Sequence, residues 1–183
     1  YAAFFVLNGL YNAGAGDVAM KLMADENSEN VRTWAHVLRK LNATISPEAW
    51  DPANKPNMTF SHPWGSAPAS AIAQGMFGLQ PIDPAFETFQ VKIQPGGVRS
   101  ASIKLPTIRG AVEAAYNLND GENGITAEVK IPANTKAKVS LPVSSSAHAK
   151  LLVDGEVQLA ERDGKYLAVT LGSGAHTLAI PMK

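Results

Sequence analysis

Four side chains that suit sugar chemistry lie close together in the polar stretch 43–68. Glu48 offers a carboxylate that can work as an acid or a base, and its surroundings can shift its pKa. Trp50 and Trp64 offer flat apolar faces with a polar N–H, a combination that stacks well on a sugar ring. His62 supplies a donor or an acceptor near neutral pH. Because loops on rigid scaffolds gather binding and catalytic groups, this stretch is the first candidate for a functional site.

Each of these residues also has an ordinary structural explanation. On spacing alone the signal is weak: the base rate makes Glu48 a surface carboxylate, and Trp50 and Trp64 also suit plain core anchors. His62 can cap the helix that follows it, because proline comes next and suits a first helical turn. Asp51, which precedes a proline, is typical of a turn. The spacing therefore leaves both interpretations open.

Other familiar chemistries lack their residues. The chain has no cysteine, which excludes disulfides, thiolate zinc sites and cysteine nucleophiles. His36 has no partner in an HExxH pattern, Ser66 does not lie in a G-x-S-x-G pattern, and no glycine-rich phosphate loop is present. No metal and no cofactor is predicted.

Composition narrows the classes of partner. The 183 residues include 16 Lys and Arg against 16 Asp and Glu, so the formal net charge is zero. Proteins that bind nucleic acids or anionic membranes usually carry a basic excess, and neither class is predicted here. No apolar run reaches the roughly 18–20 residues that a membrane span needs. Hydrophobic residues at 45% and charged residues at 17% are typical of a globular protein.

The first half of the chain has helical spacing. Apolar residues three and four apart predict helices over 1–11 and 31–41, and a run of small residues predicts a helix over 63–77 that is buried on most sides. In the segment 31–41 the expected buried stripe consists of Val31, Trp34, Ala35, Leu38 and Leu41. This stripe makes Trp34 a core residue.

The second half alternates instead. Apolar and polar residues take turns around 89–93, 101–105 and 125–131, the pattern of half-buried strands. Strands at this spacing, each with one solvent-exposed face, predict an antiparallel β-sandwich. Three Asp-Gly pairs predict hairpin turns, because glycine tolerates positive φ: Asp120-Gly121, Asp154-Gly155 and Asp163-Gly164.

The net charge differs between the predicted helical half and the predicted strand half of the chain. Residues 1–88 carry five basic and eight acidic residues, a net charge of −3, and residues 89–183 carry eleven and eight, a net charge of +3. The prolines between residues 81 and 84 stand at the change of pattern and mark the natural domain boundary.

Four motifs together resemble bacterial alpha-L-rhamnosidases of glycoside hydrolase family 78. Residues 1–17 have the pattern Tyr-x-x-Phe-Phe-x-Leu-x-x-Leu-Tyr-x-Ala-Gly-x-Gly-Asp, which is similar to a late helix of that family's barrel. The segment from Thr44 to Asp51 resembles its Thr-x-x-x-Glu-x-Trp motif. Residues 61–68, Ser-His-Pro-Trp-Gly-Ser-Ala-Pro, resemble the motif that opens the last barrel helix, and the run from Gly78 to Pro95 resembles the entry to its C-terminal β domain.

The resemblance implies an α+β chain, in which residues 1–83 are the last helices of an (α/α)6 barrel and residues 84–183 are an antiparallel β-sandwich. It implies an inverting glycoside hydrolase that removes terminal alpha-L-rhamnose from glycans or glycosides. Inversion uses two carboxyl groups on opposite faces of the bond. On the resemblance, Glu48 is the catalytic general base, His62, Trp64 and Trp50 bind the substrate, and the general acid belongs to another segment. An alternative is an accessory β-sandwich of an inactive relative, which binds carbohydrate or braces the barrel.

Two positions depart from the family pattern: Pro47, where an aromatic or apolar residue is usual, and Gly65, where serine is common. The apolar start of the chain, without a helix cap, predicts a fragment of a longer enzyme, inactive alone because it lacks the acid and most of the barrel. Helices separated from their neighbours expose apolar faces, so the partners expected for residues 1–41 are the rest of the barrel or a second copy. The resemblance favours a periplasmic or secreted enzyme.

Overall fold

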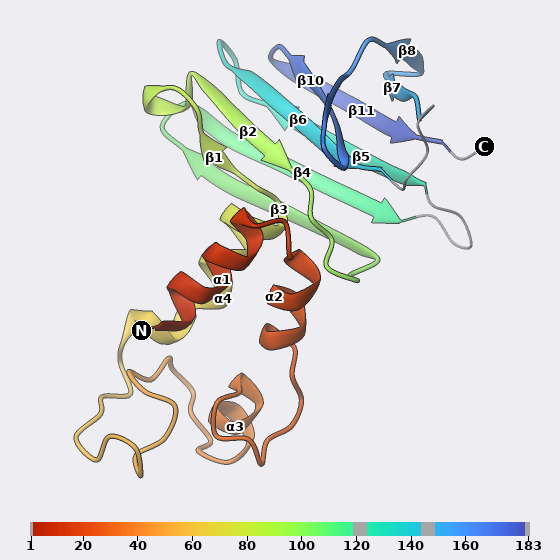
Figure 1. Ribbon diagram of the computed structural model, residues 1–183. Coiled ribbons are helices and arrows are strands. Elements are labelled where there is room, and N and C mark those ends of the chain that lie inside the picture. The colour runs from red at the N-terminus through yellow and green to blue at the C-terminus, as the bar shows by residue number, and fades with distance from the viewer. Residues whose placement is uncertain (1, 119–123, 144–148, 182–183) are drawn as a thin grey trace. The chain divides into compact units, whose positions relative to one another are not determined.

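The structure is a computed structural model that describes residues 2–118, 124–143 and 149–181 (Figure 1). The chain divides into two compact units, Tyr1–Gly75 and Met76–Lys183. The first unit is helical and the second consists of two β-sheets, so the chain is α+β, as the change of pattern predicts. Among the described residues, no helix combines the length and the hydrophobicity needed to cross a membrane.

The helical unit contains four α-helices: α1 (Ala2–Asn12), α2 (Gly16–Met23), α3 (Trp34–Arg39) and α4 (Ala67–Ala71). The 3-10 helix η1 (Pro63–Ser66) leads into α4, and the π-helix η2 (Ile72–Met76) continues from it, so the predicted helix over 63–77 is present with three different windings. Helix α1 packs against α4.

Helix α1 packs through the side that carries Leu7 and Tyr11, which are 1% and 2% exposed. Gly75 faces the ring of Tyr11 so closely that a side chain at position 75 would overlap it. Burial of the Tyr11 phenol raises its pKa to about 12. The opposite side of α1 is different, because Phe5 and Val6 are half exposed or more.

The expected helix over 31–41 is shorter, and of the five residues expected in its buried stripe only Ala35 is buried. Helix α3 begins only after Thr33, whose Oγ1 accepts a hydrogen bond from the His36 N–H at 3.1 Å. The buried residues are Ala35, His36 and Val37, whereas Leu38 is 61% exposed. The stripe differs because His36 is held by the Ser28 carbonyl and the Asp51 carboxylate, and those contacts turn its side of this short helix inward.

The second unit begins with β1 (Gln80–Pro81), the 3-10 helix η3 (Pro84–Phe86) and β2 (Thr88–Lys92), and its long strands follow. These are β3 (Ser100–Thr107), β4 (Gly110–Leu118), β5 (Ile125–Ile131), β6 (Lys136–Pro142), β10 (Tyr166–Leu171) and β11 (Gly174–Ile180). The described residues between β6 and β10 include the short strands β7 (Leu151–Val153), β8 (Glu156–Gln158) and β9 (Glu161–Asp163).

The strands form two sheets with the orders β1-β2-β6-β10-β9 and β3-β4-β5-β11-β7-β8. Alternation places one set of side chains inside, and Phe89, Val91, Val139, Leu141 and Leu178 have no exposed surface. Among the described strands, every pairing is antiparallel except β2 with β6, which is parallel and aligns Phe89 with Ala137. The sheets are therefore rich in antiparallel pairs, as predicted, but one of them is mixed.

Two of the predicted turns are confirmed. Asp154 and Gly155 join β7 to β8 with positive φ at both residues, 52° and 88°, the conformation of a type I′ turn. Asp163 ends β9, and Gly164, with φ of 56°, joins it to β10 together with Lys165. The third pair, Asp120-Gly121, lies outside the described residues.

Candidate functional site

The segment between α3 and η1 folds back on itself, and Glu48 lies where its two arms meet. The Glu48 N–H donates to the Thr59 carbonyl at 2.9 Å, and the Thr59 N–H donates to Glu48 Oε2 at 3.2 Å. The other carboxylate oxygen, Oε1, lies 3.1 Å from the Lys55 ammonium. Each oxygen of this carboxylate thus has one fixed donor, and each keeps a second lone pair for another partner.

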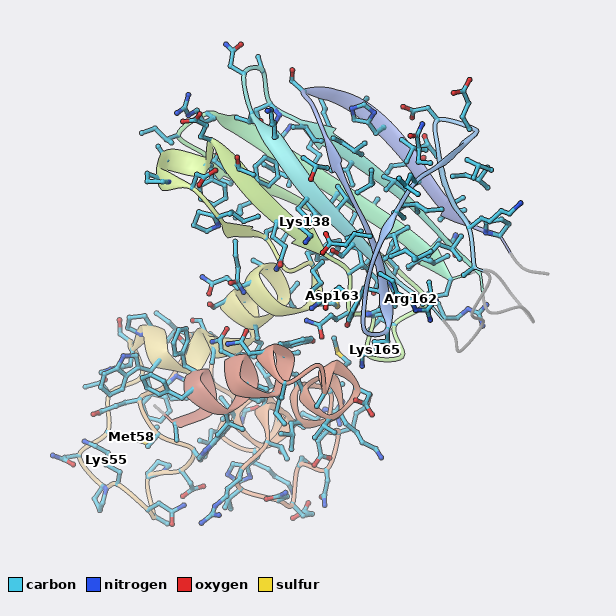
Figure 2. All side chains as sticks on the ribbon, turned by 45° about the horizontal axis from the view of Figure 1, so that its top comes forward. Lys55, Met58, Lys138, Arg162, Asp163 and Lys165 are labelled. Carbon is cyan, nitrogen blue, oxygen red and sulfur yellow. The ribbon has the colours of Figure 1, made fainter. Side chains whose placement is uncertain are left out.

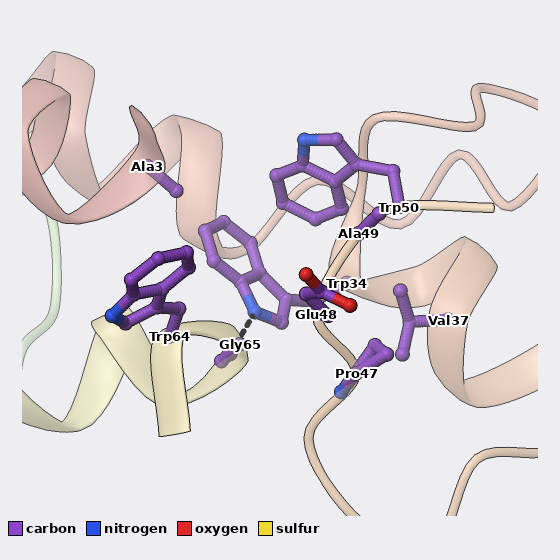
Figure 3. A pocket seen from close by; sticks show the side chains of 9 residues that line it. All are labelled: Ala3, Trp34, Val37, Pro47, Glu48, Ala49, Trp50, Trp64 and Gly65. Carbon is purple, nitrogen blue, oxygen red and sulfur yellow. Dashed lines mark hydrogen bonds between the residues drawn. The ribbon is translucent and has the colours of Figure 1, made fainter. Parts of the chain in front are cut away.

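The same carboxylate lines an open pocket (Figure 3). The lining is otherwise apolar or aromatic and consists of Ala3, Trp34, Val37, Pro47, Ala49, Trp50, Trp64 and Gly65. The Trp34 and Trp50 rings meet edge to face, with centroids 4.8 Å apart. The Trp34 Nε1–H donates to the Gly65 carbonyl at 3.0 Å, which fixes that indole against η1. A charged group among aromatic faces is the arrangement that binds and orients a polar ring.

Among the residues proposed for substrate binding, Trp50 and Trp64 share the pocket with Glu48. His62 does not line it, but its ring lies against the Trp64 indole with centroids 4.6 Å apart. The His62 N–H donates to the Ser46 carbonyl at 2.8 Å, and Nδ1 lies 3.3 Å from Thr59 Oγ1. His62 therefore belongs to the same loop cluster, one residue removed from the pocket wall.

The surroundings of Glu48 favour its ionised form. The hydrogen bond from Lys55, the hydrogen bond from the Thr59 N–H and the positive fields of Lys55 and His62 lower the pKa of this carboxyl below its ordinary value. An ionised carboxylate at the wall of an aromatic pocket can accept a proton from water or can balance positive charge on a substrate.

The sequence pattern missed the role of Trp34. Helical spacing predicted a core residue, but Trp34 is only half buried and lines the pocket between Glu48 and Trp64. Trp34 is the first residue of α3, and its indole meets Trp50 of the loop and the Gly65 carbonyl of η1. In retrospect, the signal for this pocket position is an indole at the first residue of a short helix that is followed by a loop containing another tryptophan.

Lys55 was also missed, and no periodic signal points to it. A turn that starts at Asp51 and the burial of Met58, which is 8% exposed, bring residue 55 back toward Glu48. Figure 2 shows Lys55 and Met58 as neighbours on this loop. The contact depends on the folding of the loop and not on the number of residues between Lys55 and Glu48.

A third missed feature is the pair of His36 and Asp51. His36 Nε2 lies 2.7 Å from Asp51 Oδ2, and Nδ1 lies 2.9 Å from the Ser28 carbonyl oxygen. Both partners can only accept, so both ring nitrogens must carry a proton, and the imidazole is a cation. These contacts raise the pKa of His36, mainly through the hydrogen bond that His36 donates to Asp51. Asp51 Oδ1 also accepts from the Ala53 N–H at 2.7 Å, which confirms the predicted turn.

The pair connects three separate segments beside the pocket. Ser28 precedes α3, His36 lies on α3, and Asp51 directly follows Trp50 of the pocket wall. Because the His36–Asp51 pair lies next to the pocket lining, we interpret it as a structural contact that holds the loop carrying Glu48, and we call this pair the clamp. Among the described residues, no three His, Asp or Glu side chains come together as a metal site would require.

Over its described residues, the β unit has no comparable site built on aromatic side chains. Phe77, Phe89, Tyr116 and Tyr166 are all at most 5% exposed. Phe86 is half buried and packs on Phe89 with ring centroids 5.9 Å apart. Within the described part of this unit, the aromatic side chains therefore form no exposed row on which a sugar could stack.

Comparison with known proteins gives one family and one fold. Residues 78–152 match the family model of the bacterial alpha-L-rhamnosidase C-terminal domain. No curated protein sequence matches the chain. The resemblance seen in the motifs is therefore confirmed for this segment by a model of the family itself.

Solved alpha-L-rhamnosidases have the same fold. The structure from Dictyoglumus thermophilum matches with a TM-score of 0.83 at 18% identity, over 100% of this chain and 20% of that one. The Streptomyces avermitilis enzyme, solved with L-rhamnose, matches with 0.77 at 19% identity, over 94% and 17%. The Aspergillus terreus enzyme matches with 0.70 at 22% identity, over 95% and 18%. The chain thus spans about a fifth of the length of these enzymes, and both of its units lie within the matched region.

Proposed function

We propose that the chain is the C-terminal part of an inverting alpha-L-rhamnosidase, which removes terminal alpha-L-rhamnose from glycans or glycosides, and that Glu48 is its general base. One observation carries this proposal: an ionised carboxylate lies at the wall of a pocket built from three tryptophans. The structural neighbours named alpha-L-rhamnosidases and the matching C-terminal domain model support the class of reaction.

In this proposal residues 1–83 are the last helices of an (α/α)6 barrel, and residues 84–183 are the β-sandwich that follows it. Apolar side chains on one side of α1 and α2 support the assignment of the helices, since Phe5 is 58%, Val6 49% and Leu22 46% exposed. Surfaces of this kind usually have a partner. The preceding helices of the barrel are the partner expected here.

The chemistry assigned to Glu48 follows from its charge and its contacts. In an inverting glycosidase the base removes a proton from the water that attacks the sugar, and the acid lies roughly 6.5–9.5 Å away. Glu48 is ionised at neutral pH, and its lone pairs that are not used by Lys55 or Thr59 are available to that water. The acid comes from outside this chain, so the chain alone is expected to be inactive.

The aromatic side chains around Glu48 bind the sugar in this proposal. Rhamnose has an apolar methyl group and apolar ring faces, which suit the indoles of Trp50 and Trp64. Trp34 forms the floor between them and is fixed by its hydrogen bond to Gly65. His62 supports Trp64 and contributes positive field at Glu48.

The test is Glu48→Gln in the intact enzyme, assayed on an aryl alpha-L-rhamnoside. A general base contributes about a hundredfold or more, so kcat should fall by at least that factor while the melting temperature stays near that of the wild type. Glu29→Gln is the matched control, because Glu29 is an exposed ion-pair partner of Lys40, away from the pocket. Normal activity of Glu48→Gln would remove Glu48 from the mechanism.

For the β unit we propose that it supports the barrel and does not bind sugar. The same role is proposed under the alternative in which the parent protein is an inactive relative. The burial of Phe89, Tyr116 and Tyr166 favours bracing, because an accessory sugar-binding module of this kind needs exposed aromatic faces. Titration of the chain with L-rhamnose, followed by chemical shifts of β-unit residues, tests this choice. Saturable shifts confined to the β unit would overturn it.

A further inference from the structure

Lys55 is the residue that sets the working state of the proposed base. Its ammonium lies 3.1 Å from Glu48 Oε1 and 3.4 Å from the Asn57 side-chain oxygen, so two acceptors hold it in place. We propose that Lys55 is a positioning residue that keeps Glu48 ionised and aimed into the pocket under acidic conditions. This inference rests on the proposed function of Glu48 and adds a residue that the family motifs do not contain.

The position of Lys55 is built by the loop and is not a chance surface contact. The Lys55 N–H donates to the Asp51 carbonyl at 3.2 Å, and the Lys55 carbonyl accepts from the Met58 N–H at 3.0 Å. Asp51 is itself held by His36, and Met58 is buried. Both ends of the turn are thus anchored, and residue 55 stays on the side where Glu48 lies.

The groups around Glu48 make Lys55 the dominant charge. From its own loop, Glu48 meets the Lys55 ammonium, the Thr59 N–H and the field of His62. The elements packed around it contribute apolar side chains: Trp34 and Val37 from α3, Trp64 from η1 and Ala3 from α1. Of the charged side chains, only Lys55 donates directly to the carboxylate within the described residues.

This arrangement has a chemical consequence with two sides. A neighbouring cation favours the carboxylate over the carboxylic acid, so the base stays ready at lower pH. The same cation makes the carboxylate a weaker base, so Glu48 removes a proton from water less readily. This disadvantage matters at a pH where Glu48 would be ionised even without Lys55. Lys55 therefore favours activity at acidic pH and contributes little at neutral pH.

The experiment compares the pH dependence of kcat/KM for the intact enzyme and its Lys55→Met and Lys55→Arg variants on an aryl alpha-L-rhamnoside. We expect Lys55→Met to lower the ratio of kcat/KM at pH 4 to that at pH 6.5 by at least about threefold, with the value at pH 6.5 changed less than about twofold. Lys55→Arg, which keeps the cation, should restore the ratio. Lys40→Met removes the same charge from an exposed pair with Glu29 and should leave the profile unchanged.

The outcomes separate this inference from the proposed function. A Lys55→Met profile like that of the wild type overturns the inference, and so does an equal loss at every pH, which is the mark of a purely structural role. If Glu48→Gln still abolishes activity in either case, the proposed base stands without Lys55. If Glu48→Gln is active, both proposals fall. Side-chain exposure of 38% at Lys55 makes global unfolding by Lys55→Met an unexpected result, and the melting temperature checks it.

Discussion

Gly65 is a position where one added methyl group should disturb the candidate site. A Cβ placed on Gly65 would lie 2.6 Å from the Pro47 carbonyl oxygen, 2.9 Å from the Ser46 Cβ and 3.0 Å from the Pro47 nitrogen. Two of these atoms are backbone, so no side-chain rotation relieves the overlap. To reach the 3.4 Å of an ordinary contact, the Pro47 carbonyl must move by about 0.8 Å. Glu48 is the next residue and must move with it.

Two opposing free-energy terms decide the stability of Gly65→Ala. Overpacking a site that cannot rearrange freely costs about 1–3 kcal/mol. Replacing glycine by alanine inside a helix recovers about 0.5–1 kcal/mol of conformational entropy. The packing term is larger, so the variant should be less stable by about 1–2 kcal/mol. In a chain of this size that lowers the melting temperature by about 2–8 °C.

Gly9 supplies the matched control. It lies inside α1, is exposed, and a Cβ there has nothing within 4 Å. Gly9→Ala therefore keeps only the favourable term and should raise the melting temperature by about 1–4 °C. All three tryptophans, at positions 34, 50 and 64, belong to the helical unit, so tryptophan fluorescence follows the unfolding of the unit that carries both substitutions.

Gly65→Ala also tests the site. In the intact enzyme, a shift of nearly 1 Å at the base should lower kcat by up to about a hundredfold for Gly65→Ala. Gly172→Ala, at a position of the β unit where an added Cβ has nothing within 4 Å, should leave kcat unchanged. If Gly65→Ala melts at or above the wild-type temperature and keeps full activity, the tight contact between η1 and the Glu48 loop is refuted.

The remaining predictions concern the clamp, the exposed helices and the β core. Because the His36 pKa is raised and the Asp51 pKa is lowered, the stability that this pair contributes is complete between their ordinary pKa values of 3.8 and 6.5. It is lost as the pH falls through the lowered Asp51 pKa and as the pH rises through the raised His36 pKa. His36→Gln should flatten the alkaline decrease in melting temperature. The chain should self-associate through α1 and α2, and Phe5→Gln with Leu22→Gln should shift light scattering toward monomer, whereas a wild-type monomer would contradict this. Phe89→Ala should destabilise the β unit by about 3–5 kcal/mol in urea unfolding followed by circular dichroism at a β-sheet wavelength, and a cost below about 1 kcal/mol would contradict its place in the core.

Much of the β unit could be predicted from the sequence, because its signal is local. In β5 the inward residues Ile125 to Ile131 alternate with polar ones, and alternation alone identifies both the strand and its buried face. The parallel pairing of β2 with β6 has no such signal, since the 43 residues between Lys92 and Lys136 leave the choice of neighbour open. Pairing partners depend on the whole sheet, and periodicity does not describe them.

The helical unit shows the same limit more sharply. The chemical character of Glu48, Trp50 and Trp64 could be recognised from residue type and motif, but the contacts that define their setting could not. Lys55 reaches Glu48 only because the loop turns back, and His36 is turned inward only because Asp51 and a distant carbonyl accept from it. These are interactions between loops, which follow from the folded geometry and leave no repeat in the sequence.

The two positions that depart from the family pattern, Pro47 and Gly65, meet in one contact. The backbone of Pro47 lies where a side chain on residue 65 would stand, so the proline-containing loop and the glycine fit each other. Proline restricts the backbone of its own residue and of Ser46, which prevents the small rotation that would make room for a Cβ. Pro47→Ala should therefore reduce the cost of Gly65→Ala, with an interaction free energy of about 0.5–1 kcal/mol in a double-mutant cycle followed by tryptophan fluorescence. Strictly additive effects would mean that the two departures are independent.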